Sequence, residues 1–167
     1  MSDQRLDSQL LCSVCIANYN GLATLANCLD SILSQDCPGA VEVLVHDDAS
    51  SDKSAAWVRQ HYPDVVLIES QANVGFCVAN NRMAAQARGR YLLLFNNDAQ
   101  LHPGALQALY THANNHNFDG ILGLPQYQLP GGELFDRGSR FDPFLNVVPN
   151  HDSARRGASM VMGACLW

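Results

Sequence analysis

Short apolar runs, spaced by longer amphipathic segments, constrain the fold of this chain more than any other feature. The runs occupy 11–17, 41–47, 64–69, 91–95 and 121–125. Near-continuous hydrophobicity over so few residues is typical of strands that are buried on both faces of a sheet.

The segments between these runs carry apolar residues at helical spacing. The first repeats them at Leu22, Leu25, Leu29 and Ile32 and ends near Gln35. Further helices are expected at 55–60, at 76–88 and from Pro103 through Tyr110. Strands that alternate with helices predict an α/β fold in which a mainly parallel sheet carries helices on both faces.

Glycine and proline set the expected boundaries of these elements. Gly89 is expected to close the helix at 76–88 as a left-handed cap, and Pro103 to begin its helix with His102 as the N-cap. Beyond Gln126 the pattern loosens. There we expect a hairpin around Gly131-Gly132, an irregular segment, and a strand within 158–167.

Composition bounds the class of protein. The chain has 167 residues, of which 47% are hydrophobic and 16% charged, as expected for one globular domain with a sizeable core. A net charge of −6 offers no basic surface, so no nucleic-acid partner is expected. No apolar run approaches the roughly 20 residues of a transmembrane helix, and the N-terminus lacks the basic start of a signal peptide. We expect a cytoplasmic protein, with peripheral association at the inner face of the membrane left open.

The six cysteines lie mostly in apolar segments and are expected to pack as small hydrophobic residues. Cys12 and Cys15 form a C-x-x-C pair within a predicted strand. Side chains three residues apart on a strand point to opposite faces, so this pair is not expected to share a metal ion.

Polar side chains cluster where three of the predicted strands end. The clusters are ANYN at 17–20, HDDASSD at 46–52 and NNDAQ at 96–100. The carboxyl ends of parallel strands lie along one edge of a sheet, and ligands bind beyond that edge in open α/β folds. These clusters are therefore the candidate functional site.

Asp98 is the candidate metal ligand of this site. Mg²⁺ and Mn²⁺ prefer oxygen ligands together with substrate phosphates, and one carboxylate beside two amides leaves most positions to diphosphate oxygens and water. The alternative is an Asx turn. A helix N-cap is disfavoured, because the expected cap of the next helix is His102.

Asp47 and Asp48 have a structural alternative as well. Ser51 or Asp52 is a natural N-cap for a helix beginning near Lys53, and the whole segment is good turn chemistry. A cap needs only one of these residues. The surplus carboxylates can accept an N–H group from a nucleotide base.

Gly75, just before the predicted helix at 76–88, and the polar residues within that helix each have two interpretations. Gly75 gives the backbone freedom either beside a ligand or in an ordinary tight bend. Asn80, Asn81 and Arg82 either lie on an exposed face or serve the polar loop after the next strand, and Arg82 can meet a phosphate.

Four stretches together carry a family resemblance. In order and spacing, CSVCIANYNG, VEVLVHDDASSD, NVGFCVANNRMAAQARGRYLLLFNND and MVMGAC resemble the successive motifs of family-2 inverting glycosyltransferases. The resemblance covers most of the chain and implies the GT-A fold, a Rossmann-like, mainly parallel sheet. Within that family the chain looks most similar to the bacterial rhamnosyltransferase-like branch, which builds O-antigen and other surface polysaccharides. In this branch the metal motif often begins with Asn.

The resemblance implies a role for each matching residue. The positions it places along the nucleotide are Ala17, Asn18, Tyr19, Asp48, Asn73, Gly75, Asn81 and Asn97. Asp48 matches an aspartate near the base, and Asn81 a helix asparagine that supports the metal loop. Asp98 and Asn96 match the two ends of the Asp-X-Asp metal motif, with Asp98 as the direct ligand. Asn96 departs from that motif, as Ala17-Asn18 departs from the commoner Pro-Thr, and the lost carboxylate puts metal affinity in doubt.

The implied reaction transfers a sugar, with inversion, from a nucleoside-diphosphate sugar to a hydroxyl of a saccharide or lipid-linked acceptor. Mg²⁺ or Mn²⁺ would stabilise the departing diphosphate, and a carboxylate would deprotonate the acceptor. In the family that base follows the segment matching GACLW, so we expect it beyond Trp167 and expect residues 1–167 to be the nucleotide-sugar-binding portion of a longer domain. Asp119, Glu133, Asp136 and Asp142 are alternative bases, each expected to be a solvated loop acid.

Rival classes fit less well. A sugar-nucleotide pyrophosphorylase has a glycine-rich loop after its first strand and a dinucleotide dehydrogenase has G-x-G-x-x-G there, whereas this chain has ANYNG. A catalytically inactive glycosyltransferase-like scaffold or interaction module stays open as an alternative function.

Overall fold

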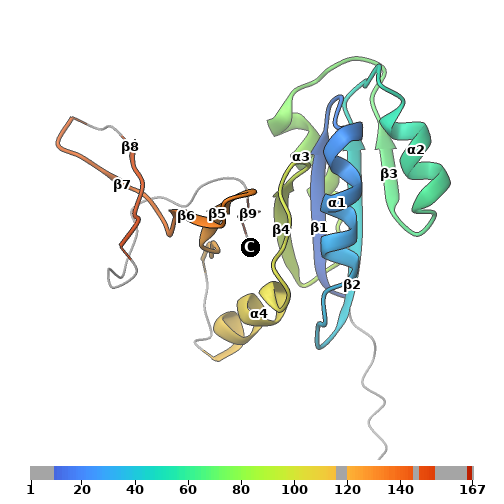
Figure 1. Ribbon diagram of the computed structural model, residues 1–167. Coiled ribbons are helices and arrows are strands. Elements are labelled where there is room, and N and C mark those ends of the chain that lie inside the picture. Colours follow the sequence, from blue (N-terminus) through green and yellow to red (C-terminus); the bar gives the residue numbers. More distant parts are fainter. Residues whose placement is uncertain (1–9, 116–119, 145–146, 153–164, 167) are drawn as a thin grey trace, which may run out of the picture.

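A five-stranded sheet forms the centre of the molecule (Figure 1). The computed structural model describes residues 10–115, 120–144, 147–152 and 165–166. The strands of the sheet are β1 (Leu10–Asn18), β2 (Ala40–Asp47), β3 (Val66–Glu69), β4 (Tyr91–Asn96) and β9 (Cys165–Leu166), in the order β3-β2-β1-β4-β9. The first four pair in parallel and β9 pairs antiparallel with β4. The mainly parallel sheet predicted from the sequence is thus confirmed.

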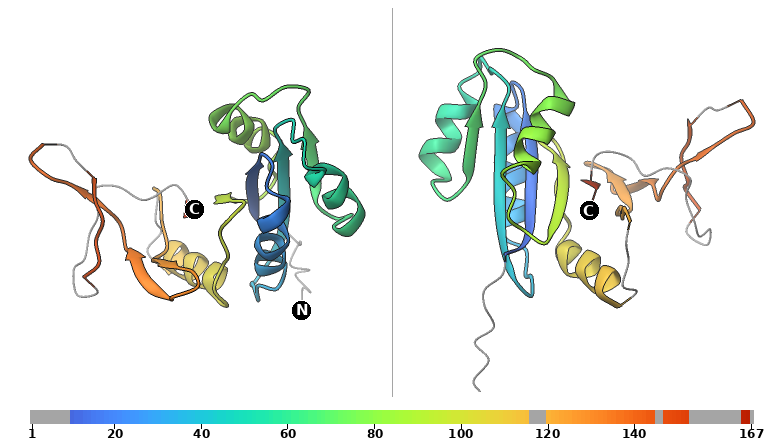
Figure 2. Two further views of the ribbon diagram at one scale, coloured as in Figure 1. Left: turned by 45° about the horizontal axis from the view of Figure 1, so that its top comes forward. Right: turned by 180° about the vertical axis from the view of Figure 1, so that it is seen from behind.

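Helices cover both faces of this sheet, as the two further views show (Figure 2). They are α1 (Leu22–Leu33), α2 (Ser54–His61), α3 (Phe76–Ala84) and α4 (Ala105–Asn115). The larger hydrophobic core joins α1, α2 and α4 to one face through residues such as Leu29, Val58 and Leu106. On the other face Met83 of α3 packs with Cys15 and Leu44.

The two cysteines of the C-x-x-C pair lie on opposite faces of β1, as their spacing predicts. Cys12 belongs to the larger core and Cys15 to the smaller one, and both are fully buried. Burial, with a smaller contribution from Glu42, raises the pKa of the Cys15 thiol to about 12. The thiols therefore serve as packing groups.

The predicted end of α3 and the predicted cap at Gly89 are wrong. The helix ends at Ala84, four residues early, and Gly89 does not have a positive φ. Instead, the Gly89 N–H donates to Ser13 Oγ at 2.7 Å, and a Cβ at position 89 would lie 2.4 Å from the Ser13 nitrogen. Glycine is needed here because the chain passes close to β1.

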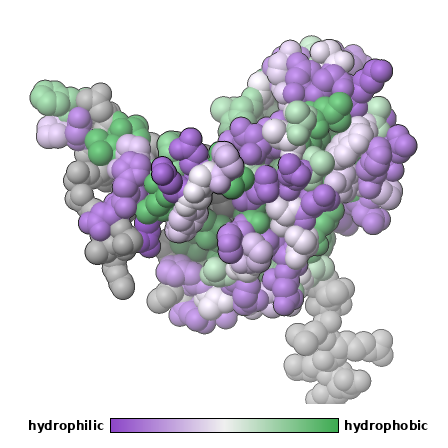
Figure 3. All heavy atoms as spheres, in the orientation of Figure 1, coloured by the Kyte–Doolittle hydropathy of each residue, from purple (hydrophilic) through white to green (hydrophobic). Residues whose placement is uncertain are grey.

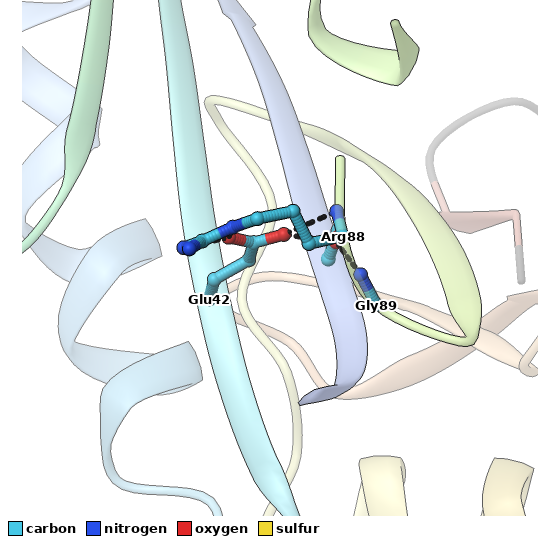
Figure 4. Close-up of polar contacts among 4 residues, drawn as sticks. Glu42, Arg88 and Gly89 are labelled. Carbon is cyan, nitrogen blue, oxygen red and sulfur yellow. Dashed lines mark hydrogen bonds and ion pairs between the residues drawn. The ribbon is translucent and has the colours of Figure 1, made fainter. Parts of the chain in front are cut away.

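A buried carboxylate draws this segment onto the sheet (Figure 4). Glu42 of β2 accepts hydrogen bonds from the Arg88 backbone N–H at 2.7 Å, from Arg88 Nε and Nη2, and from Ser13 Oγ at 2.6 Å. We call Ser13, Glu42, Arg88 and Gly89 the lower clamp, since it lies where β1 and β4 begin. It fixes the entry of the chain into β4.

The start of α4 also differs from the prediction. The helix begins at Ala105, and Pro103 lies in a turn in which the Ala105 N–H donates to the His102 carbonyl at 3.0 Å. Gly104 has a φ of 82°, a left-handed conformation incompatible with a continuous helix from Pro103.

The segment after α4 forms short antiparallel pairs instead of a further parallel strand. The strand predicted at 121–125 is wrong, because β5 (Gln126–Gln128) follows it and pairs with β6 (Glu133–Asp136). The hairpin predicted around Gly131-Gly132 is confirmed. β7 (Arg140–Phe141) pairs with β8 (Val147–Val148). Of the strand predicted within 158–167, residues 165–166 form β9, and the others lie outside the described residues.

Strands β5 to β8 extend to one side of the sheet, beyond α4 (Figure 1). Hydrophobic side chains gather on this part of the surface (Figure 3). Tyr127, Leu129 and Phe144 are among its exposed apolar residues. No helix in the part of the chain that the structure describes has the length and hydrophobicity to cross a membrane.

Candidate functional site

The parallel register brings the predicted site residues to one edge of the sheet. Asn18 at the end of β1 lies opposite Asp47 at the end of β2, and Ala17 lies opposite Asn96 at the end of β4. The chain order reverses here, because β2 and β3 extend from one side of β1 and β4 lies on the other. Ligands of open α/β sheets bind at such a switch point.

A hollow of about 200 Å³ opens at this edge. Its lining consists of Ala17, Asn18, Tyr19, Asp48, Asn73, Gly75, Phe76 and Ala79. All but Phe76 and Ala79 were among the residues predicted for the nucleotide. The sequence analysis missed those two, although their three-residue spacing directly after Gly75 is the pattern of a helix that presents its first turn to a ligand.

Two aromatic side chains lie at this pocket. Tyr19 from the loop after β1 is 55% exposed and Phe76 from the first turn of α3 is 53% exposed. Exposed aromatic rings beside a pocket offer apolar faces on which a planar base can stack. The pocket therefore combines apolar faces with the carboxylate and amides of the strand ends.

Asp48 holds one wall of the pocket in place. Its carboxylate is buried and accepts the backbone N–H groups of Val74 at 2.7 Å and Gly75 at 2.8 Å. Gly75 has a φ of 83°, so glycine is required for the turn that presents these donors. The loop that carries Asn73 is thereby attached to the end of β2.

Asp47 and Asp52 have structural partners. Asp47 accepts hydrogen bonds from Asn18 Nδ2 at 2.9 Å, from Ser54 Oγ and from the Ser50 N–H. Asp52 accepts the N–H of Leu22, the first residue of α1, at 2.8 Å and the N–H of Ser54, the first residue of α2, at 2.9 Å. Asp52 thus binds the first N–H of both helices, but the N-cap residue of α2 is Lys53, so the prediction of Ser51 or Asp52 at that position is wrong.

Asn97 lies beside Asn18 across the switch point. Its Nδ2 donates to Asn18 Oδ1 at 2.9 Å. This bond joins the loop after β4 to the loops after β1 and β2. The Asp48 N–H donates to the Asn18 carbonyl at 2.8 Å, so hydrogen bonds connect the predicted residues Asn18, Asp48 and Asn97.

Asn96 and Asp98, the predicted metal ligands, flank Asn97. Asp98 is exposed, and the backbone carbonyl of Asn96 accepts the Ala99 N–H at 3.3 Å and the Cys28 Sγ–H at 3.4 Å. Burial and then the Asp98 charge raise the pKa of Cys28 to about 12. Among the described residues no three His, Cys, Asp or Glu side chains are grouped for a metal ion. One exposed carboxylate beside two amides fits a hard cation that takes its other ligands from phosphate oxygens and water.

Asn81 lies outside the pocket lining. It is exposed on α3, whereas its neighbour Asn80 is buried and donates to the Phe76 carbonyl at 2.9 Å. Asn80 therefore supports the first turn of α3, which carries Phe76.

A buried histidine adjoins the site. Arg82 Nη1 donates to Ser70 Oγ at 2.7 Å and lies 3.4 Å from His46 Nε2. Burial lowers the pKa of His46, the Asp48 charge opposes that shift and the Arg82 charge adds to it. His46 is a neutral packing group at the end of β2, and Arg82 already has partners.

Three of the alternative bases, Glu133, Asp136 and Asp142, belong to the segment that follows α4. Asp136 is buried and accepts the N–H groups of Gly138 and Asn150 and the Ser139 hydroxyl. Its role is to hold the hairpin region together, so the expectation of a solvated acid is wrong for this residue. Asp119 lies outside the described residues.

Known proteins share this architecture. The S. aureus protein TarS, residues 1–349 in complex with UDP, superposes with a TM-score of 0.62 over 72% of this chain and 40% of its own, at 23% identity, a likeness of fold. The mannosyltransferase PcManGT from Pyrobaculum calidifontis, solved with GDP-Man and Mn²⁺, gives a TM-score of 0.52 at 30% identity over 59% of this chain and 30% of its own.

Sequence relatives point the same way. An N-acetylglucosaminyl-diphospho-decaprenol L-rhamnosyltransferase from Mycobacterium tuberculosis is 31% identical over 57% of this chain and 34% of its own length. The chain spans 31%, 31% and 18% of the length of three further curated relatives. The pattern of the family described as "Glycosyl transferase family 2" matches residues 13–165. By that match and the GT-A architecture, this chain belongs to glycosyl transferase family 2.

Proposed function

We propose that this chain provides the donor site for transfer of a sugar, with inversion, from a nucleoside-diphosphate sugar to an acceptor hydroxyl. The observation that carries the proposal is the pocket at the switch point, where Tyr19, Asp48 and Asn73 from three separate loops meet. A nucleotide there has two exposed aromatic rings to stack on and a carboxylate able to accept an N–H group of the base.

Asp98, with Asn96 and Asn97 beside it, is the proposed place for Mg²⁺ or Mn²⁺. A divalent cation at that position supplies positive charge that stabilises the departing diphosphate. The protein's own contribution is to hold one carboxylate and the neighbouring amides at the end of β4, adjacent to the nucleotide pocket.

We look for the catalytic base elsewhere in the protein. The carboxylates of Asp47, Asp48 and Asp52 at this edge all accept hydrogen bonds from the protein. Losing such a carboxylate to proton transfer would disturb the loops that it holds. The proposed base is an acid beyond Trp167, as the family resemblance implies.

The proposed setting is assembly of a bacterial surface polysaccharide at the inner face of the membrane, with a saccharide or lipid-linked acceptor. Support comes from the M. tuberculosis rhamnosyltransferase, whose name specifies a diphospho-decaprenol acceptor. UDP, dTDP and GDP are the donor nucleotides to compare, because TarS and PcManGT are known with UDP and GDP-Man respectively.

Calorimetric titration of these three nucleotides, with and without Mn²⁺, tests the proposal. We expect one nucleotide to bind, and Mn²⁺ to strengthen that binding by about tenfold or more, the effect of 1.4 kcal/mol. Asp98→Ala should remove the strengthening. Asp64→Ala is the matched control, since Asp64 is also an exposed loop aspartate but precedes β3 at the opposite end of the sheet.

Each other outcome has a definite meaning. Nucleotide binding of equal strength with and without Mn²⁺ would refute the proposed cation site but not the proposed nucleotide site. Failure of all three nucleotides to bind the folded chain would refute the donor site, and a non-catalytic interaction module would then become the better interpretation.

A further inference from the structure

The buried side-chain amide of Asn18 connects Asp47 at the end of β2 with Asn97 in the loop after β4. Asn18 is 1% exposed. Its Nδ2 donates to Asp47 Oδ2 and to Ser54 Oγ, each at 2.9 Å, and its Oδ1 accepts from Asn97 Nδ2 at 2.9 Å. Both ends of the Asn18 amide are therefore used.

The direction of these bonds is determined by the chemistry of Asp47. An ionised carboxylate only accepts hydrogen bonds, and the Ser54 hydroxyl proton is directed at the same Asp47 oxygen, 3.2 Å away. Asn18 must therefore turn its NH₂ group towards Asp47 and Ser54. Its carbonyl oxygen is left to face Asn97.

The same logic applies to Asn97. Because it meets a carbonyl oxygen, it must present its NH₂ group to Asn18. The carbonyl oxygen of the Asn97 amide then lies on its other side, where no hydrogen bond to it occurs among the described residues. A carboxylate two side chains away thus determines which atom of Asn97 a ligand can meet.

Gly21 leaves room for this arrangement. A Cβ at position 21 would lie 2.3 Å from Asn18 Oδ1 and 2.3 Å from Asn97 Nδ2, the two atoms of the hydrogen bond. The φ of Gly21 is −98°, which any residue can adopt, so the requirement for glycine here is one of space.

We propose that Asn18 is a positioning residue that orients Asn97, so that Asn97 offers an acceptor oxygen to the ligand beside Asp98. This inference rests on the proposed function for the identity of that ligand, which is a divalent cation or a ribose hydroxyl of the nucleotide. A cation is attracted to an acceptor oxygen and repelled by an NH₂ group, and a ribose hydroxyl can donate its proton to that oxygen.

Gly21→Ala tests the proposal, with Gly131→Ala as control, because a Cβ at Gly131 would come no closer than 3.9 Å to Glu133 Cγ. NMR of the Asn97 side-chain NH₂ group reports on the hydrogen bond without any ligand. We expect slow hydrogen exchange in the wild type and in Gly131→Ala, and exchange faster by about tenfold in Gly21→Ala, matching a lost hydrogen bond. Equal exchange in all three proteins would overturn the proposal.

Measurements of UDP binding to the same variants distinguish the two candidate ligands of Asn97, the divalent cation and a ribose hydroxyl. If the Asn97 oxygen meets the cation, Gly21→Ala should lose the Mn²⁺-dependent part of UDP binding and keep the metal-free part. If it meets a ribose hydroxyl, the metal-free part should fall. Unchanged binding in both conditions, where the wild type binds UDP, would show that the orientation of Asn97 is irrelevant to the ligand and would refute the proposal.

Asn97→Asp gives an independent sign test should Gly21→Ala fail to fold. The proposal expects weaker nucleotide binding in the presence of Mn²⁺, since a carboxylate cannot donate to Asn18 Oδ1 and the loop must move. Stronger Mn²⁺-dependent binding from the added charge would refute it. If the wild type binds no nucleotide, the proposed function fails, while the NH₂ exchange measurement still decides whether Asn18 orients Asn97.

Discussion

The two ends of the sheet each carry a polar cluster that joins β1, β2 and the β4 region, and the two clusters differ in what they leave open. In the lower clamp every oxygen of Glu42 is occupied, by Ser13 and Arg88. We call the opposite end of the sheet, with Asn18, Asp47, Asn97 and Asp98, the upper edge. There the side chains of Asn18 and Asp47 are likewise hydrogen-bonded, but Asp98 is exposed and the Asn97 amide has one side that Asn18 does not use.

Glycine serves both clusters in the same way. Gly89 and Gly21 each lie where a Cβ would come within 2.5 Å of atoms from another strand or loop. At Gly89 those atoms include the backbone of Ser13, and at Gly21 they are side-chain amide atoms. Since both ends of the sheet have such contacts, polar contacts between strands do not by themselves indicate a functional site. The upper edge differs because, among the described residues, it keeps hydrogen-bond acceptors that a ligand can use.

Gly89→Ala should have the largest effect on stability. The new methyl group would collide with the β1 backbone, which cannot rotate away, so we expect the free energy of unfolding to fall by about 3 kcal/mol. Urea denaturation measures it, with Gly131→Ala as the control expected to change little. A loss within about 0.5 kcal/mol would contradict the close passage of the chain at Gly89.

Glu42→Gln should cost about 2 kcal/mol, because one amide oxygen cannot replace two carboxylate oxygens among these donors. Arg88 is itself 69% exposed in its side chain, which limits the charge contribution. Glu69→Gln, in an exposed pair with Arg59, is the control and should cost less than about 1 kcal/mol. Similar losses in the two variants would remove the distinction between clamp and surface pair.

The clamp should also depend on pH. Burial raises the pKa of Glu42, but hydrogen bonds from Ser13 and Arg88 outweigh it, and the pKa lies below its ordinary value. A lowered pKa means that the stabilisation is complete above the unfolded-state value, about 4.3, and is lost as pH falls through the folded-state value. The stability gap between wild type and Glu42→Gln should therefore be constant near neutrality and shrink in acid.

Asp48→Asn should affect stability less and nucleotide binding more. The amide can accept only one of the N–H groups of Val74 and Gly75, so we expect a loss of about 1 kcal/mol in the free energy of unfolding. The displaced loop and the altered group beside the base should lower nucleotide affinity by about tenfold or more. Unchanged affinity at reduced stability would make Asp48 a structural residue like Glu42.

The smallest expected effect is a difference in reactivity between two cysteine thiols of the folded chain. Cys77, exposed on α3 next to Phe76, should react with a thiol reagent in the folded chain, whereas buried Cys28, with its pKa raised to about 12 by burial and by Asp98, should not. Mass spectrometry after brief labelling identifies the modified residue. Rapid modification of Cys28 would contradict its packing beneath the loop that contains Asp98.

The alternation of strands and helices was predictable because apolar periodicity is local. The opposite faces of Cys12 and Cys15 and most of the pocket lining also followed from local pattern and family resemblance. The end of α3 did not, because residues 85–88 are good helix formers whose backbone is captured by Glu42, 46 residues from Arg88. Local propensity carries no information about such a distant partner.

The site was predictable in position and less so in detail. Strand ends pointed to Asn18, Asp48 and Asn97, yet the hydrogen bonds among them depend on register and on side-chain direction. The sequence analysis assigned no role to Gly21, because nothing in one sequence tells a glycine needed for space from one needed for φ. Phe76 was predicted only as a helix residue, although its position directly after Gly75 was a signal for the pocket that the sequence analysis did not use.

Asp52 has a consequence for the cooperativity of this edge. One carboxylate binds the first backbone N–H of both α1 and α2, so the positive ends of two helix dipoles converge on a single charge. Fraying of either helix start would leave the shared anion with half its partners and so weaken the other. The loops after β1 and β2 are in this way joined through one carboxylate, and we expect their local unfolding to be coupled.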